Sequence, residues 1–416
     1  IKEKTMASIK DHFEMPSKSR TWSLALIFIG ALLLVIGFVT KGMSSEEHVR
    51  TVFWGTLMYN SIFFTLICNA SMFFICATTL AMGGWQMAFR RVPEAISKMV
   101  IILGSVTWLI LLYIVVIDNN NDIHIFHWLS DESKSDPILK GKLGFLNPTF
   151  FFIWTTLAIG LWILLGARMR KLSSEFDEGP FDADQGKSLI WKNTVTAAMF
   201  IVWFALTVAS TIPWLWLMSI DAHWYSTMYS WYTFASSFVS GMSLIALWVI
   251  FLKNKGYLEY TNQEHLHDIG KFMFAFSVFW TYLWFSQYML IWYGNISEET
   301  VYFKHRVQGP YKGIFFLNLI INFVCPLLIL MKRSTKRNYT LVTFMAVLII
   351  FGHWIDFFQM VMGSVSKEHV TLGWLDFGIA AFFVGLIIFL VGRELANKPL
   401  LSGNHPFLKE SIIHHT

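Results

Sequence analysis

The stretch that decides the fold is YTLVTFMAVLIIFGHWIDFFQMVMG, residues Tyr339–Gly363. It exceeds the ~20 residues that a helix needs to span a bilayer, and its single charged side chain is Asp356. Outward from it, the chain carries ten apolar stretches in all, counting this one. They run Thr21–Thr40, Val52–Ala81, Met99–Ile117, Pro148–Gly166, Asn193–Leu217, Met228–Leu252, Ile269–Trp292, Gly313–Met331, Tyr339–Gly363 and Gly373–Gly392. We therefore expect an all-α polytopic membrane protein with about ten transmembrane helices.

The composition excludes several classes of function. Hydrophobic residues make up 55% and charged residues 14% of the chain, against about 25% charged in soluble domains. The net charge of +5 comes from basic residues that flank apolar segments, so we expect no nucleic-acid partner. The cysteines Cys68, Cys76 and Cys325 lie inside apolar stretches, and the chain has no CxxC and no CxxCH. We expect no disulfide framework, no metal, no iron–sulfur ligation and no haem bound by this chain.

The distribution of positive charge predicts the orientation. The N-terminal tail, the even-numbered loops and the C-terminal tail hold 23 of the 32 Lys and Arg residues. Because cytoplasmic segments carry the excess of positive charge, we expect both termini in the cytoplasm. The predicted organisation is a cytoplasmic lead-in, 1–20, a transmembrane domain, 21–392, and a cytoplasmic tail, 393–416. The chain starts at Ile1, so we expect further residues upstream.

Asp356 is the first candidate functional residue. Helical spacing places His353, Asp356 and Gln359 near one face of the ninth predicted helix. An acid at a helix centre costs roughly 2.5–3.5 kcal/mol on insertion scales, and such groups usually mark proton or substrate paths. Two interpretations stay open: a proton-carrying pair of Asp356 and His353, or a hydrogen bond that only joins helices.

Other polar residues extend this candidate path. Asn318 and Asn322 lie four apart in the eighth predicted helix, on one face. Asp221 and His223 lie in the outer loop between the fifth and sixth helices and form a candidate exit for protons. Asp376 is an acid at the outer start of the tenth helix. For each, helix packing or capping is the alternative interpretation.

Three runs resemble one family of membrane subunits. They are MSIDAHWYSTMY, Met218–Tyr229; WTYLWFSQYMLIWYGN, Trp280–Asn295, followed by Glu298 and Glu299; and GHWID, Gly352–Asp356. In this order they resemble the ActF subunits of bacterial alternative complex III, a quinol:cytochrome c oxidoreductase, within the wider NrfD/PsrC-like family. Trp85, Arg90, Arg91 and Glu94 are similar to a Trp–Arg–Arg–Glu pattern of that family. The resemblance implies two four-helix bundles, 52–217 and 228–363, with flanking helices 21–40 and 373–392.

The resemblance also implies partners and a location. We expect the bacterial inner membrane, an ActC-like paralogue that handles quinol, an iron–sulfur subunit and subunits with haem c. A terminal oxidase and structural lipids are further expected partners. Electrons would pass through those subunits and not through this chain. The ActC paralogue has a His-Ala-Gly segment linked to quinol where this chain has Asn69-Ala70-Ser71. Asn69 can hydrogen-bond a quinone oxygen but takes up no proton at physiological pH.

The leading hypothesis is a structural and proton-conducting subunit of a quinol-oxidising respiratory complex, with no redox cofactor of its own and no catalytic residue. Three alternatives remain. The chain could be a scaffold without chemistry, a quinone-binding subunit with a site at Asn69, or a stand-alone secondary transporter. Transporters often have broken helices in matching positions of two repeats, and Pro213 and Pro326 do not match in that way.

Overall fold

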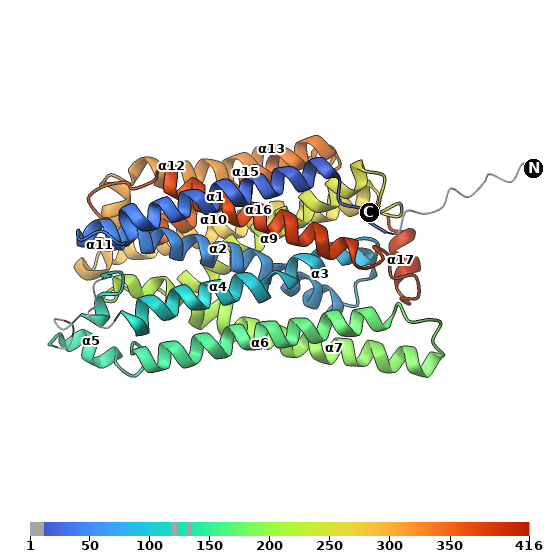
Figure 1. The fold of residues 1–416 in the computed structure, drawn as a ribbon, viewed down its shortest axis with the longest axis horizontal. Helices are drawn as coiled ribbons and strands as arrows, with labels where there is room; N and C mark the ends of the chain where they lie inside the picture. Colours follow the sequence, from blue (N-terminus) through green and yellow to red (C-terminus); the bar gives the residue numbers. More distant parts are fainter. Residues whose placement is uncertain (1–11, 119–122, 131–132, 134, 416) are drawn as a thin grey trace, which may run out of the picture.

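The computed structural model describes residues 12–118, 123–130, 133 and 135–415, and these residues form helices and no strand (Figure 1). Nine segments within them are long and apolar enough to cross a membrane. These are Ser17–Gly42 (α1, Ser17–Gly37, and a π-helical turn), Glu47–Leu80 (α2), Arg91–Ile117 (α3, Arg91–Lys98; α4, Val100–Leu112; and a π-helical turn), Pro148–Glu175 (α6), Ala183–Trp216 (α7, Ala183–Leu206, to α8, Ile212–Trp216), Met228–Asn254 (α9), Lys312–Leu330 (α12, Lys312–Leu319, to α13, Cys325–Leu330), Tyr339–Val365 (α15) and Trp374–Ala396 (α16). The prediction of an all-α polytopic membrane protein is confirmed.

The remaining apolar stretch, Ile269–Trp292, lies in α10, Gln263–Gly294. This helix has the length of a span but is not one of the nine apolar segments. Its composition explains the difference, because polar and amphipathic side chains such as Gln287, Tyr288 and Trp292 replace aliphatic ones. Short helices connect the long ones: α5 (Pro137–Lys142), α11 (Ser297–Val307), α14 (Arg333–Lys336) and α17 (Leu408–Ile412).

The helices begin where side chains can cap them. Asn147 accepts a hydrogen bond from the Phe150 amide at 2.8 Å, and Pro148 occupies the first turn of α6. The Asn262 and Asn338 side chains cap α10 and α15 in the same way. A capping Asn satisfies amides that have no partner within the helix, and proline suits the first turn because its missing N–H is not needed there.

Two long helices, α2 and α9, form the centre of the packing. Both are buried over most of their apolar length, whereas most of α1 is exposed. Helix α2 contacts α4, α7 and α9, and α6 packs against α4 and α7. Helix α9 contacts α10 and α15, while α13 packs on α10 and α12 on α15. These contacts form one group of helices around α2 and another around α9. The boundaries of the two predicted bundles stay a prediction.

Helices α1 and α16 form a pair at one side of the molecule (Figure 1). A methyl group on Gly30 would lie 2.5 Å from the Phe382 nitrogen, and one on Gly385 would lie 2.9 Å from the Ile27 nitrogen. The two backbones therefore approach closely only because glycine has no side chain, as is common between helices in lipid. This close pair forms one wall of the large cavity described below.

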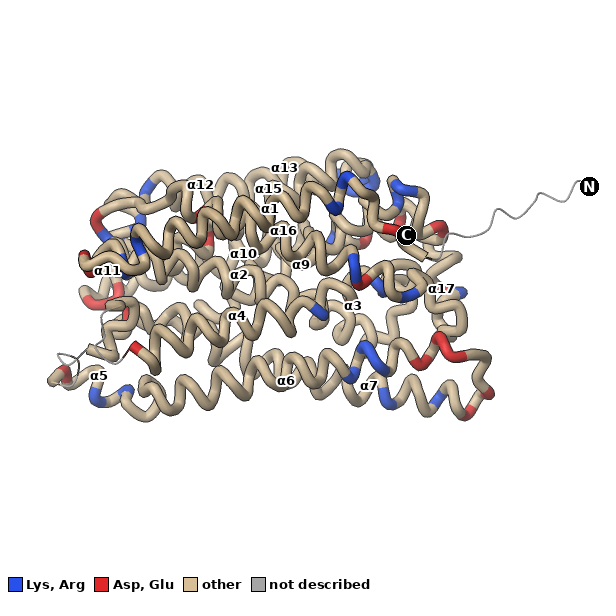
Figure 2. Tube along the Cα trace, viewed as in Figure 1, with Lys and Arg blue, Asp and Glu red and all other residues tan. Residues whose placement is uncertain are grey.

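Charged residues gather at the two ends of the long axis, with a mostly uncharged zone between them (Figure 2). The beginning of the described chain and its C-terminus lie at the same end. There the Glu14 amide donates to the Tyr257 hydroxyl, and Asn262 donates to the His414 carbonyl. The side of the membrane on which that end lies stays a prediction. Most of the predicted lead-in, 1–20, lies outside the described residues.

Candidate functional site

The Asp356 carboxyl lies at the meeting point of three helices. It is 1% exposed and belongs to α15. Its Oδ1 accepts a hydrogen bond from the Tyr232 hydroxyl of α9. Its Oδ2 accepts from Trp280 Nε1 of α10 at 3.0 Å and from the Ser236 hydroxyl of α9 at 3.2 Å. Three neutral donors therefore face one buried acid, and hydrogen bonds of this kind are what a buried charge requires.

His353 joins this site through Ser236. The Ser236 Oγ lies 2.9 Å from His353 Nδ1, and His353 Nδ1 lies 3.8 Å from Asp356 Oδ2. A serine hydroxyl carries one proton, so it can donate to the acid while His353 Nδ1–H donates to it, or the reverse. The three side chains thus form a continuous line along which a proton can shift by exchange of hydrogen bonds. His353 and Asp356 thus lie on the same face of α15, as helical spacing predicts.

Among the described residues no Lys or Arg forms an ion pair with Asp356, and His353 is the one basic side chain within 4.0 Å of its carboxyl. A cavity of about 20 Å³ nevertheless connects the acid to Arg306 of α11, and Gln287, Gln359 and Tyr302 also line it. This volume fits about one water molecule. The guanidinium of Arg306 donates to the Ser364 hydroxyl at 2.7 Å and to the Tyr302 carbonyl at 2.9 Å.

Several buried polar atoms around Asp356 have no partner among the described residues. They are His353 Nε2, both side-chain polar atoms of Asn322, Asn318 Oδ1, Gln359 Nε2, Gln287 Oε1 and Ser277 Oγ. Asn318 Nδ2 donates to Gln359 Oε1 at 2.7 Å, which joins two of the sequence-predicted residues. Buried polar groups almost always have partners, and ordered water is the usual one where protein supplies none. The cluster therefore suits a hydrated interior.

Asn322 lies in a π-helical turn, Ile320–Val324, between α12 and α13. Pro326 follows, and a proline removes one backbone hydrogen bond from the helix. A methyl group on Gly352 would lie 2.1 Å from Asn322 Oδ1, so the Asn322 side chain packs directly on the α15 backbone next to His353. Such π-helical turns are frequent at functional sites.

Asp221 lies at the end of the molecule that carries α11, opposite the chain termini (Figure 1). Its Oδ1 is 3.0 Å from the Lys367 ammonium. Burial opposes ionisation of the Asp221 carboxyl, but the nearby Arg306 and Lys367 outweigh it, so its pKa lies below the ordinary value. The sequence around Asp221 has no Lys or Arg, and the structure brings Arg306 from α11 and Lys367 from the loop after α15. Tyr302 lies beside Arg306, with burial raising the pKa of its phenol to about 12.

His223 and Asp376, two of the predicted residues, have partners outside the Asp356 site. His223 does not contact Asp221; its Nε2 lies 2.5 Å from Asp136 Oδ2, and the hydrogen bond from His223 lowers the pKa of Asp136. Asp376 accepts from the Tyr59 hydroxyl at 2.8 Å and from the Gly373 amide at 2.9 Å. These bonds cap α16 and join it to α2. The structure thus groups His353, Asp356, Gln359, Asn318 and Asn322, with Asp221 at the end of the molecule that carries α11.

Asn69 of α2 is 1% exposed, and its Nδ2 has no described partner. It does not line the large apolar cavity of the molecule. The quinone site at Asn69 stays a prediction. The described residues also contain no cluster of three His, Cys, Asp or Glu that could hold a metal ion.

Sequence reasoning missed Tyr232, Ser236 and Trp280 as partners of the acid, and Arg306 as the cation of the cavity. Trp280 belongs to one of the quoted motifs, and Ser236 to a run of serines in the sixth predicted helix. Those signals were visible, but nothing in the sequence says which helix faces Asp356. Neither the protein-family models nor the curated proteins searched contain a match to this chain.

Proposed function

We propose that this chain is the integral membrane subunit of a respiratory quinol:electron-acceptor oxidoreductase of the alternative complex III type, in which it holds no redox cofactor and conducts protons. The observation that carries the proton-conducting role is the Asp356 site. It combines a buried acid, a histidine joined to it through Ser236, and adjacent polar atoms; among the described residues the acid has no ion-paired Lys or Arg and these atoms have no protein partner. Intramembrane acids of this kind are typical of proton relays.

Asp356 has partners for either protonation state. Tyr232, Trp280 and Ser236 can donate to the carboxylate. The neutral acid can instead donate to Ser236, whose hydroxyl can pass a proton to His353 Nδ1. A shift along this line breaks and forms one O–H or N–H bond at each step, and it needs no movement of the helices.

The proposed path opens toward the end of the molecule that carries Asp221. The small cavity links Asp356 to Arg306, and Arg306 and Lys367 lie near Asp221. In the opposite direction, Asn322 and Ser277 provide polar atoms without protein partners. Water bound between them would continue the path, since hydrogen-bonded water is an effective bridge between polar groups.

A pure scaffold is the principal rival. In that case the bonds to Asp356 only join α9, α10 and α15, and replacing the carboxyl by an amide changes neither turnover nor proton movement. The unpartnered atoms around the site favour the relay, because a site built for packing alone would leave fewer buried polar groups unsatisfied.

The respiratory assignment rests on the three motifs and is tested by purification. The chain is extracted from its native membrane in mild detergent by an affinity tag, and co-purifying proteins are identified by mass spectrometry. Absorption bands of haem c, an iron–sulfur protein and a second polytopic subunit would support the assignment. A colourless chain without such partners would remove it and favour a stand-alone transporter.

A further inference from the structure

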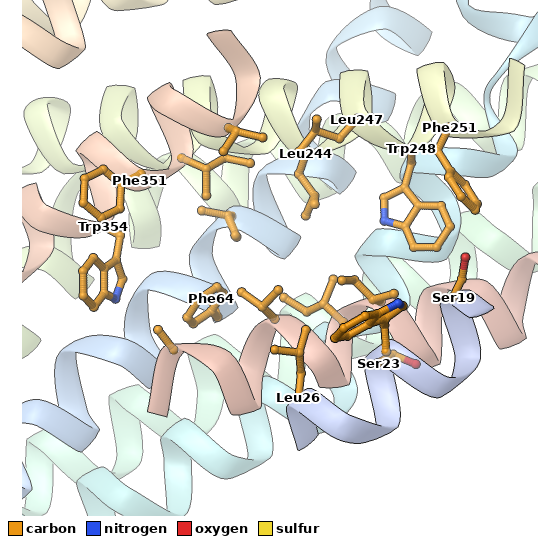
Figure 3. A pocket seen from close by; sticks show the side chains of 18 of the residues that line it. Ser19, Ser23, Leu26, Phe64, Leu244, Leu247, Trp248, Phe251, Phe351 and Trp354 are labelled. Carbon is orange, nitrogen blue, oxygen red and sulfur yellow. The ribbon is translucent and has the colours of Figure 1, made fainter. Parts of the chain in front are cut away.

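A cavity of about 610 Å³ lies between the α1–α16 pair and parts of α2, α9 and α15 (Figure 3). Leu26 and Trp22 line it from α1, and Val384 and Ala380 from α16. The opposite side is formed by side chains of α2, α9 and α15, among them Phe64, Leu244, Trp248 and Phe351. This cavity is separate from the Asp356 site, since neither Asp356 nor His353 lines it.

The cavity exists because α16 packs on α1 and α2 but makes no extensive contact with α9 or α15 in the part of the chain that the structure describes. The glycines between α1 and α16 hold these two helices together as a unit. Trp22 is 71% exposed while it lines the cavity, so the cavity is open toward the surrounding lipid.

The polar side chains of the cavity gather at one end. Lys18, Ser19 and Ser23 lie at the beginning of α1. Figure 3 shows Ser19 and Ser23 near Trp248 and Phe251, with Phe351 and Trp354 at the far end. The Lys18 side chain is exposed and has no ion pair with any described residue.

At the other end of the cavity, beside Trp354, the lining residues offer no free hydrogen-bond donor. Trp354 Nε1 already donates to Asn60 Oδ1 at 2.8 Å. Phe351 and Phe377 make up other parts of that end. A molecule that fits the cavity therefore has one polar, negatively charged end beside Lys18 and an apolar remainder.

The length of the cavity fits one leaflet of a bilayer. Its lining on α16 extends from Phe377 to Ile388, which corresponds to about 16 Å at 1.5 Å per residue. Half the hydrocarbon thickness of a bilayer is about 15 Å. An acyl chain whose head group lies at Lys18 would thus be long enough to run along the lining from Ile388 to Phe377, which lies in the first turn of α16.

We propose that this cavity binds one anionic phospholipid, with its phosphate near Lys18 and an acyl chain between α16 and the α9–α15 wall. The lipid belongs to the leaflet on the side of the chain termini, and it joins the α1–α16 pair to the remainder of the protein. A quinone is the less suitable occupant, because its ring is uncharged and gains nothing from the Lys18 charge.

The test measures lipid retained by the full chain, with whatever subunits accompany it, after extensive washing in mild detergent. Phospholipids and quinones are extracted and quantified by mass spectrometry. The wild type is expected to retain about one anionic phospholipid per chain. In nanodiscs, the affinity for labelled phosphatidylglycerol should fall about fivefold in Lys18→Glu. One basic side chain near the membrane surface contributes about this factor to the binding of anionic lipid. Lys192→Glu, at an exposed lysine of α7 at the same end, is the matched control and should change nothing.

A second pair of variants tests the apolar part. Val384→Trp fills the cavity and should abolish lipid retention, whereas Val202→Trp, on an exposed position of α7, should not. Equal retention in Lys18→Glu and wild type, equal retention in Val384→Trp and Val202→Trp, or a quinone in place of the phospholipid would each overturn the proposal. Lys18 is exposed, so its substitution tests the proposal even if the tryptophan variant does not fold.

Discussion

Two buried carboxyl groups of this protein are held in opposite ways. Glu94, near the end of the molecule that carries the termini, accepts from Arg90 Nε at 3.0 Å and from Arg91 Nη1 at 2.7 Å. Arg91 also pairs with Asp177. Asp356, within α15, has the neutral donors Tyr232, Trp280 and Ser236 and the nearby His353.

The difference indicates which acid can exchange a proton. Glu94 is surrounded by permanent positive charge, so its negative charge is compensated and its site serves to hold α3, α6 and the C-terminal tail together. Asp356 lacks such compensation, and the atoms around it can accept or donate protons. Burial alone therefore does not identify a functional acid; the kind of partner does.

The largest effect on stability is expected at the Glu94 site. Arg91→Ala leaves buried carboxylates without a partner, and breaking a buried ion pair in this way costs about 3–5 kcal/mol. The free energy of unfolding, measured by denaturant titration in detergent, should fall by that amount. Lys187→Ala is the control, because its pair with Asp184 is exposed and contributes about 0–1 kcal/mol. Equal losses of stability in the two variants would contradict the structural role of the buried Glu94 site.

A smaller loss is expected at the contact between Asn322 and α15. In Gly352→Ala the new methyl group would collide with Asn322 Oδ1, and overpacking of this kind costs about 1–3 kcal/mol. Gly160→Ala in α6 has open space around it and should stabilise the helix by up to about 1 kcal/mol. Adding Asn322→Ala to Gly352→Ala should restore part of the stability. No restoration would show that Asn322 does not pack on Gly352.

The docking of the C-terminal tail should depend on pH. Burial and the nearby Arg90 lower the pKa of His405 from 6.5 to about 3. The docked tail thus binds fewer protons than the released tail, and its stability falls as the pH drops below about 6.5, by at most about 1.4 kcal/mol per pH unit. Hydrogen exchange of α17, corrected for the intrinsic rate, should show less protection at pH 5 than at pH 7. His405→Phe should remove this dependence, and equal protection of the wild type at both pH values would count against it.

The smallest effect is expected at His223. Its partner Asp136 is partly exposed and lies away from Asp221, and ion pairs near solvent contribute little. His223→Ala should therefore leave both the unfolding transition and proton movement unchanged. A clear loss of proton movement in this variant would mean that the outer exit includes His223, as the sequence suggests.

The sequence predicted the nine apolar spans found among the described residues, and it singled out Asp356 as a buried acid, because hydrophobic length and a lone acid are local signals. It also placed His353 and Gln359 on the face of Asp356, since helical periodicity relates residues a turn apart. It did not predict Tyr232, Ser236 and Trp280, because periodicity shows which face of a helix is polar and not which helix lies opposite.

The surroundings of Asp221 show the same limit. Asp221 and His223 are two residues apart, yet a tight turn directs them to different partners. The cations near Asp221 are Arg306, which belongs to α11, and Lys367, which lies in the loop after α15. Contacts between loops depend on how the whole bundle is assembled, so no local pattern could have identified them.

In the proposed function Asp356 carries protons, whereas Asp376, an acid buried in the first turn of α16, does not. The direct measurement is proton movement during quinol oxidation, with the purified complex in proteoliposomes and a pH-sensitive dye. Asp356→Asn is expected to keep assembly and turnover and to lose proton movement at least tenfold, about 1.4 kcal/mol or more, whereas Asp376→Asn keeps both activities. Proton movement at the wild-type level in Asp356→Asn would contradict the relay and leave the scaffold as the better account.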